Sequence, residues 1–245
     1  RVNRNISVSE DSITLPKAGR VRAVIHRQAP ADHKLKSVTV SQNRDGTYYA
    51  SVLYEYEEPA VPAETIATHI GLDYNSDGLY VDSNGDCADM PHFYREAEKR
   101  LAKAQRCLSR KQKGSKNREK QKRRVAKLSR HAANQRKNYL HKKSSEITNQ
   151  YDLVSVEDLN MRGMAQSLRL GMSTLVNGYG MFCSMLEYKQ RRKGHHFIRV
   201  NKFFPSTQLC QCGYKNPETK QLSMRTVTCP VCGRTYDRDH NAAIN

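Results

Sequence analysis

The fold is decided by two short apolar runs that each end on a carboxylate. Residues 66–73 read IATHIGLD, and residues 152–157, about 80 positions later, read DLVSVE. Continuous apolar runs of this length predict strands buried within a sheet. Asp73 and Glu157 close these strands, and a carboxylate at a strand end faces the crevice in which open sheets bind ligands. Turn and helix-cap acids also occur at such positions, so the prediction rests on their combination with other features.

The residues around these two runs predict an α/β core. Asn84-Gly85 is a hairpin-turn signal that indicates a short antiparallel meander after the first run. The pattern becomes helical from about residue 92, and Lys113-Gly114-Ser115 interrupts it, so we expect two helices packed as a hairpin. A helix over 177–194 and a strand over 196–204 follow. Strands that alternate with helices in this way are typical of an α/β fold.

Residues 1–58 indicate β structure of a different kind. Asp45-Gly46 is the turn signal of a hairpin between two strands rich in β-branched and aromatic residues. Shorter strands precede it, so we expect part of a small barrel, and Pro59 and Pro62 mark a linker to the rest of the chain. The expected strands lie at residues 12–15, 22–25, 37–42 and 47–57.

The positive charge of the chain is concentrated in one segment. The chain carries 42 Lys and Arg and 24 Asp and Glu, and residues 95–143 alone hold 20 of the basic and 3 of the acidic side chains. This density predicts a nucleic-acid partner, because cationic side chains that neutralise phosphates release condensed counterions. The alternative, a solvated helical surface, normally mixes both signs. No run approaches the roughly 18 apolar residues of a membrane span, which excludes a transmembrane protein.

Four of the seven cysteines lie in the last 36 residues. They form Cys210-Gln-Cys212-Gly and Cys229-Pro-Val-Cys232-Gly, separated by 16 residues, and this pattern predicts a zinc ribbon in which four thiolates hold a structural Zn²⁺. The first pair is one residue shorter than the usual spacing, so a site with three good ligands, or a set of free thiols, remains an alternative. An odd number of cysteines without an apolar leader argues against a disulfide framework.

A third carboxylate, Asp239, begins a predicted helix after the cysteines. Three carboxylates from separated segments are suited to holding two divalent cations about 3.5–4 Å apart, a pair that activates water and stabilises the leaving oxygen in phosphodiester cleavage. Mg²⁺ or Mn²⁺ suits such ligands, since hard cations prefer carboxylate oxygen and water. Together with the basic helices, Asp73, Glu157 and Asp239 are therefore the candidate catalytic and metal-binding residues.

Four motifs together resemble a known family. Gly71-Leu-Asp73-Tyr, Val156-Glu157-Asp158-Leu-Asn160, the paired cysteines and Asp237-Arg-Asp239-His-Asn-Ala-Ala-Ile-Asn245 are similar to those of the TnpB (OrfB) proteins of bacterial insertion sequences, which are related to type V CRISPR effectors. The resemblance is collinear and spans essentially the whole chain. The last motif together with the cysteines is highly specific, whereas Gly-x-Asp alone is not.

The resemblance implies an RNase H-like (RuvC-type) nuclease core with an inserted zinc ribbon, preceded by part of a β-barrel (wedge) domain. It implies RNA-guided cleavage of target DNA with Mg²⁺, using a guide RNA from the transposon end. By motif position the catalytic acids are Asp73, Glu157 and Asp239, with Asp237 the weaker choice for the third. The expected domains are the wedge part over 1–62, the core over 63–204 with a basic hairpin over 92–145, the ribbon over 205–236 and the third core motif over 237–245.

Two alternatives to guided cleavage remain. By the resemblance, we expect the chain to begin inside the wedge domain, and its first cysteine pair is short, so an RNA-guided DNA-binding protein without useful cleavage is one alternative. The other is a transposase that joins DNA ends, because RNase H-like cores can also perform that chemistry. In each case we expect no membrane partner. The resemblance also implies a monomer in the cytoplasm of a bacterium or archaeon, associated with the nucleoid.

Overall fold

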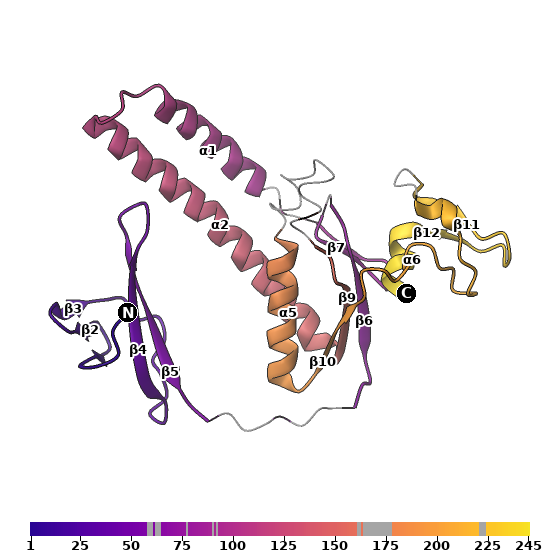
Figure 1. Ribbon diagram of the computed structural model, residues 1–245, viewed down its shortest axis with the longest axis horizontal. Coiled ribbons are helices and arrows are strands. Elements are labelled where there is room, and N and C mark those ends of the chain that lie inside the picture. Colours follow the sequence, from indigo (N-terminus) through magenta and orange to yellow (C-terminus); the bar gives the residue numbers. More distant parts are fainter. Residues whose placement is uncertain are drawn as a thin grey trace. The chain divides into compact units, whose positions relative to one another are not determined.

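The computed structural model describes residues 1–57, 61, 65–76, 78–89, 91, 93–160, 163, 178–220 and 224–245 (Figure 1). The chain forms two compact units. The first contains Arg1–Ala60 and Lys99–Arg130, and the second contains Val61–Glu98 and His131–Asn245. The long helix α2 (Lys116–Gln150) continues from the first unit into the second.

A five-stranded mixed sheet with the order β10-β9-β6-β7-β8 organises the second unit. Strands β6, β9 and β10 are parallel, and β7 and β8 add to the β6 edge in antiparallel fashion. The two apolar runs therefore become adjacent central strands, and helices connect the parallel strands, as the α/β prediction requires. The strands are β6 His69–Tyr74, β7 Tyr80–Asp82, β8 Cys87–Ala88, β9 Leu153–Glu157 and β10 His196–Val200.

One face of this sheet is apolar and packs against helices. Because successive side chains of a strand point to opposite faces, Ile70 and Leu72 of β6 share a face with Val154 and Val156 of β9. These four side chains are at most 3% exposed, and each contributes about 1.5–3 kcal/mol by leaving water. They belong to one core with residues of α2 and of α5 (Tyr179–Lys193), namely Leu140, Ile147, Phe182 and Leu186.

The short helix α6 (Arg238–Ile244) packs against β6 and β7, and Gly71 makes this packing possible. A Cβ atom at position 71 would lie 1.9 Å from the carbonyl oxygen of Ala243 in α6. Any side chain there would push the helix away, so the glycine of the Gly71-Leu-Asp73 motif is required by the close approach of α6 to the strand. Asp237 caps α6 by accepting hydrogen bonds from the backbone N–H groups of Asp239 and His240 at 3.0 and 2.9 Å.

A small cysteine-bearing lobe precedes α6 in the second unit. Its two-stranded antiparallel sheet is formed by β11 (Thr226–Thr228) and β12 (Thr235–Asp237), and a 3-10 helix, η1, covers Pro217–Lys220. Strand β12 leads directly into α6, so this lobe is joined to the third acidic segment without a linker.

The first unit contains two antiparallel sheets. One has the order β1-β2-β3, and the other is the hairpin that was expected around Asp45-Gly46, with Gly46 at a φ of +88° in the turn. The strands are β1 Ser7–Val8, β2 Ser12–Leu15, β3 Gly19–Arg22, β4 Lys34–Gln42 and β5 Tyr48–Glu55.

The predicted helical hairpin is confirmed. Helix α1 covers Phe93–Ser109, and Gly114, with a φ of +84°, lies in the turn before α2. Arg118 closes this turn, because its Nη1 donates hydrogen bonds to the carbonyl oxygens of Leu108 and Lys111 at 2.9 and 2.8 Å. These contacts join the start of α2 to the last turn of α1 and to the residues that follow it.

Two predicted strands, at 22–25 and 196–204, depart most from the structure at their ends. The strand expected at Arg22–Ile25 is wrong: the pairing of Leu15 with Gly19 starts β3 earlier, and Ser12, the first residue of β2, already pairs with Arg22. The strand expected over 196–204 ends at Val200, because Asn201 forms a turn in which its side chain accepts a hydrogen bond from the N–H of Phe203. The predicted linker residues Pro59 and Pro62, and residue 177 at the start of the predicted helix, lie outside the described residues. In the described ranges, every helix is too short or too polar to cross a membrane.

Candidate active site and metal centre

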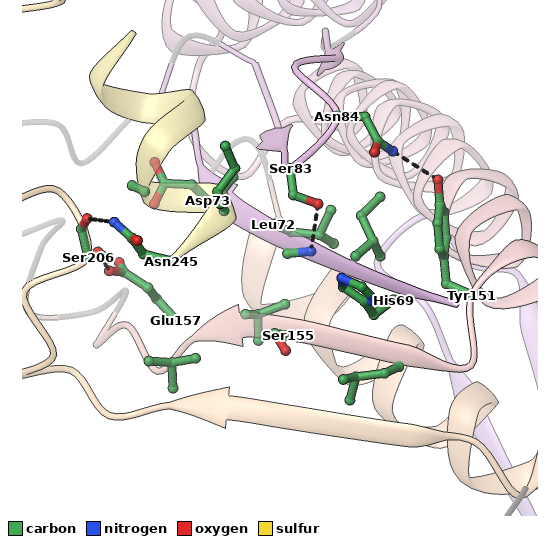
Figure 2. A pocket seen from close by; sticks show the side chains of 18 of the residues that line it. His69, Leu72, Asp73, Ser83, Asn84, Tyr151, Ser155, Glu157, Ser206 and Asn245 are labelled. Atoms are coloured by element: carbon green, nitrogen blue, oxygen red, sulfur yellow. Dashed lines mark hydrogen bonds between the residues drawn. The ribbon is translucent and has the colours of Figure 1, made fainter. Parts of the chain in front are cut away.

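The parallel pairing of β6 with β9 places Asp73 beside Glu157. Leu72 pairs with Val156, and each acid is the next residue along its strand. Neighbouring strands lie about 4.8 Å apart, so the two acids occupy adjacent positions at the same end of the sheet. Because side chains alternate, both acids point to the face opposite the apolar core. Figure 2 shows Asp73 and Glu157 at the same end of a cavity on this face.

The environment of Asp73 disfavours its charged form. Its side chain is largely buried, with the residue 9% exposed. Burial, followed by repulsion from Glu157 and Asp239, raises the pKa of Asp73 to about 8, and the nearby Arg238 only partly opposes this. The three acids predicted from the sequence therefore lie close enough to interact. Carboxylates that repel one another in a buried site gain from a bound divalent cation, which makes the donor set suitable for Mg²⁺ or Mn²⁺.

Asp239 is held by two arginines. Its Oδ1 accepts hydrogen bonds from Nε and Nη2 of Arg238 at 3.0 and 2.8 Å, and its Oδ2 is bonded by Nη1 of Arg225. Both oxygens are thus engaged by cationic groups. Consistent with this, the described part of the chain has no set of three or more carboxylate or imidazole ligands gathered within 4.8 Å of one another. The three acids converge, but not at the spacing of a closed metal site.

Glu157 is held by a serine rather than by an arginine. The Oγ of Ser206 donates a hydrogen bond to Oε1 of Glu157 at 2.5 Å. The carbonyl of Ser206 accepts a hydrogen bond at 2.7 Å from the side-chain amide of Asn245, at the end of α6. Asn241, one helical turn earlier, donates to the carbonyl of Leu209 at 2.6 Å. The segment that leads to the cysteines is therefore fastened both to the second acid and to the helix that carries the third.

The cavity beside these acids has a volume of about 500 Å³. Asp73, Glu157 and Ser206 lie at one end of it, and His69 and Tyr151 lie at the other (Figure 2). Residues of β6, β9 and α6 form its walls. Asp73 and Glu157 therefore line a cavity formed largely by the two central strands.

The four cysteines form a second cluster, and here the ligand atoms are already close. The Sγ atoms of Cys210, Cys212, Cys229 and Cys232 all lie within 4.8 Å of one another. Cys210 and Cys232 are 3.7 Å apart, as are Cys212 and Cys229. Sulfurs about 2.3 Å from a tetrahedral Zn²⁺ are separated by about 3.8 Å, so these distances fit a four-thiolate site.

The glycine after each cysteine pair closes the turn, although the first turn is one residue shorter than the second. In the second turn the N–H of Gly233 donates to the carbonyl of Cys229 at 2.9 Å, and in the first the N–H of Gly213 donates to that of Cys210 at 2.8 Å. Both glycines have positive φ, +69° and +87°, so each turn needs the conformation that glycine adopts readily. One residue fewer thus still brings both sulfurs of the first turn into the cluster.

The thiols interact strongly with one another. Backbone N–H groups of Cys232 and Val231 lower the pKa of Cys229. The pKa of Cys212 is raised instead: the N–H of Tyr214 lowers it, but burial and the neighbouring sulfurs outweigh that contribution. The pKa values of Cys212 and Cys229 thus shift in opposite directions, and a bound metal would take its ligands as thiolates.

Several residues that hold the site were not found from the sequence. Arg225 and Ser206 contact acids that are distant in sequence, and nothing in their local pattern signals this. Asn241 and Asn245 did carry a signal, because polar residues four apart share one face of a helix. His240, which was not assigned as a ligand, has its Nε2 3.2 Å from the carbonyl oxygen of Ser83.

Sequence comparisons agree with these motifs. The family model OrfB_IS605, described as a probable transposase, matches residues 51–168, and the Cas12f1-like TNB domain matches residues 179–245. A putative RNA-guided DNA endonuclease of Streptomyces pristinaespiralis is 36% identical over 220 residues, which cover 89% of this chain and 54% of the relative. The putative RNA-guided DNA endonuclease InsQ of Escherichia coli (strain K12) is 33% identical over 248 residues, which cover 95% of this chain and 60% of the relative. The chain thus spans between half and two thirds of the length of these relatives.

Solved structures show that the fold is shared. The chain resembles the protein in a cryo-EM structure of the Cas12f1-sgRNA-target DNA complex with a TM-score of 0.52 and 16% identity, over 81% of this chain and 57% of that one. A cryo-EM structure of the CRISPR-Cas12f ternary complex gives a TM-score of 0.51 and 16% identity, over 87% and 45%. Two family models in series, relatives that are 33% and 36% identical and a shared fold agree with one another: over most of its length the chain is similar to the OrfB proteins of insertion sequences.

Proposed function

We propose that the chain is a metal-dependent DNA endonuclease directed by a guide RNA. The observation that carries the proposal is the convergence of Asp73, Glu157 and Asp239 from three segments of the chain, with mutual repulsion contributing to the raised pKa of Asp73. Two relatives that are at least a third identical bear the name of putative RNA-guided DNA endonucleases. The sheet that carries the acids is, in this proposal, an RNase H-like (RuvC-type) nuclease core.

The acids have the chemistry to hold Mg²⁺ or Mn²⁺, since they supply hard oxygen ligands and the pKa of Asp73 stays raised despite the nearby Arg238. When bound, the cations supply activation of water and stabilisation of the leaving oxygen in phosphodiester hydrolysis. Asp73 and Glu157 bind and orient the cations from adjacent strand ends. Asp239 completes the set from α6, whose position on β6 is fixed by its packing on Gly71. The four thiols, by their spacing, fit Zn²⁺ in a structural role.

Other parts of the chain suit nucleic-acid partners. Residues 95–143, which form most of α1 and α2, carry 20 basic and 3 acidic side chains, and such a surface attracts phosphate backbones. We assign guide RNA and target DNA as the nucleic-acid partners of this surface. In the same proposal, 1–62 is part of a wedge domain, 63–204 is the nuclease core with its basic hairpin over 92–145, 205–236 is the ribbon, and 237–245 supplies the third motif.

Purification of the chain from cells that carry its own locus, followed by sequencing of the bound RNA, tests the proposal. We expect one discrete RNA species that ends in variable sequence, and Mg²⁺-dependent cleavage of a DNA that matches this end. Asp73→Ala and Glu157→Ala should abolish cleavage and leave the RNA bound, because these side chains hold the cation. Asp158→Ala, which removes an exposed acid next to Glu157, is the matched control and should cleave normally. Cleavage that survives both substitutions would show that the site is wrongly assigned.

One observation favours a second candidate function, RNA-guided DNA binding without cleavage. Both carboxylate oxygens of Asp239 are engaged by Arg225 and Arg238, so the third acid is not free to hold a cation in this conformation. This function predicts guide-dependent retention of DNA and no nicking in Mg²⁺ or Mn²⁺. Nicking that requires Asp73 would dismiss it, and joined DNA ends formed without guide RNA would instead indicate a transposase.

A further inference from the structure

We propose that Ser206 is a positioning residue that orients Glu157 for cation binding. This inference deepens the proposed function and rests on it, because it requires a divalent cation at the three acids. The role lies outside the carboxylate motifs themselves, since Ser206 belongs to the segment that joins β10 to the first cysteine pair.

The contact between the two side chains is short and partly buried. Ser206 is 5% exposed, and its Oγ lies 2.5 Å from Oε1 of Glu157. Among the described residues, Ser206 is the one side chain that forms a hydrogen bond with this carboxylate. A hydroxyl donates a single hydrogen, so the bond holds one oxygen of Glu157 and restricts the rotation of its carboxylate.

The serine cannot follow the glutamate if that side chain moves, because its own backbone is fixed. Its carbonyl accepts the amide of Asn245 at 2.7 Å, and its N–H donates to the carbonyl of Phe204 at 2.9 Å. The turn continues with a bond from the N–H of Gln208 to the carbonyl of Pro205 at 2.9 Å. Ser206 is therefore a rigid donor that holds Glu157, rather than a hydroxyl that adapts to it.

The other serines of the cavity wall lack this relationship to an acid. The Oγ of Ser83 accepts a hydrogen bond from the backbone N–H of Gly71 at 3.2 Å and so secures the strand. Ser155 lines the same cavity two residues before Glu157, on the same strand. Hydrogen bonds that orient a metal-binding carboxylate typically change metal affinity by about 10–100-fold, whereas a hydroxyl that only fills the wall has no such effect.

A titration with Mn²⁺, monitored by electron paramagnetic resonance, tests the role of Ser206. The protein used is the full chain, purified with its zinc. We expect Ser206→Ala to raise the Kd for Mn²⁺ about 10–100-fold and Asp73→Asn to remove binding at the acids. Ser155→Ala is the matched control, since it deletes a hydroxyl from the same cavity, and its Kd should equal that of the wild type. The unfolding temperature is measured beside each titration, because a structural role alone would lower it without changing the Kd.

The outcomes separate this inference from the function on which it rests. Wild-type binding that is lost in Asp73→Asn and unchanged in Ser206→Ala would overturn the role of Ser206 and leave the acid site standing. A Kd raised equally by Ser206→Ala and Ser155→Ala would also overturn it, since the effect would belong to the cavity wall. Failure of the wild type to bind Mn²⁺ through Asp73 would overturn both.

Discussion

The thiol cluster and the carboxylate cluster bring together metal ligands in opposite ways. Each cysteine turn holds two sulfurs within four residues or fewer, and the sulfurs already lie at the separations of a tetrahedral site. The acids come from three segments spread over more than 160 residues, and they do not lie at the spacing of a closed metal site: the pKa of Asp73 is raised, and Asp239 is held by arginines. Local turns thus prepare a closed site, whereas the sheet topology builds an open site that gains from a cation.

The largest expected effect is the loss of the thiol cluster. Cys229→Ser should remove zinc, because it replaces one of four soft ligands, and structural zinc supplies about 10–16 kcal/mol of binding free energy in small zinc domains. Elemental analysis should find about one Zn²⁺ per chain in the wild type and none in the variant. Hydrogen exchange should show lost protection over residues 210–236 and retained protection in β6 and β9.

Cys107→Ser is the matched control for this experiment. It removes an exposed thiol on α1, outside the cluster, and should change neither zinc content nor exchange. If Cys229→Ser kept both its zinc and its protection, the difference between the two clusters would not be one of a preformed closed site.

The same difference explains what could be read from the sequence. Paired cysteines followed by glycines, apolar runs and Asp-Gly or Asn-Gly turns act over a few residues, so the cluster, the strands and the hairpins were predictable. The three acids stood out by their placement at strand and helix ends, and the family resemblance named the same set. The register that sets Asp73 beside Glu157 depends on two strands about 80 residues apart, and no local pattern fixes it.

The residues that support the acids were beyond prediction for a related reason. Ser206 and Arg225 act on side chains far along the chain, and their own neighbours in sequence are ordinary loop and strand residues. The end of β3 was mispredicted because the strand begins in a tight turn at Gly19, where pairing with β2 outweighs the β propensity of Arg22–Ile25.

The next largest effect concerns the charge of Asp73 in protein without divalent cations. Its pKa of about 8 when folded lies above the value of about 3.9 for an unfolded chain. Between these values the folded chain binds more protons than the unfolded chain, so this group lowers stability as pH rises through the window. Asp73→Asn should remove that loss and gain up to a few kcal/mol over the wild type near pH 9, since one pKa unit corresponds to about 1.4 kcal/mol.

Urea unfolding at a series of pH values measures this difference. The advantage of Asp73→Asn should be small near pH 4 and should shrink at pH 9 when Mg²⁺ is added to the wild type, because a bound cation compensates the carboxylates. Asp158→Asn, at an exposed acid, should follow the wild type at every pH. A constant difference between Asp73→Asn and the wild type across this range would contradict the electrostatic explanation.

A smaller effect is expected where the open site depends on backbone packing. Gly71→Ala places a Cβ 1.9 Å from the carbonyl oxygen of Ala243, so α6 must move. Overpacking of this kind typically costs about 1–3 kcal/mol, and it should also weaken Mn²⁺ binding because α6 carries Asp239. Gly180→Ala, at a helix position where an added Cβ meets nothing within 4 Å, is the control and should be neutral or stabilising. Equal stability of the two variants would show that the helix tolerates displacement from the strand.

The smallest expected effect concerns the arginine that joins the two clusters. Arg225 precedes β11 of the cysteine lobe and bonds Oδ2 of Asp239, but its side chain is 55% exposed, so the pair is worth at most about 1 kcal/mol. Arg225→Ala should release one oxygen and strengthen Mn²⁺ binding by a few-fold, whereas Arg234→Ala, an arginine of the same lobe that contacts Gln211, should leave it unchanged. Weaker Mn²⁺ binding in Arg225→Ala would mean that the lobe supports the acid rather than competing with the cation. The thiol cluster would then help to hold the carboxylate cluster, because Arg225 adjoins the β11-β12 hairpin that lies between and beside the cysteines.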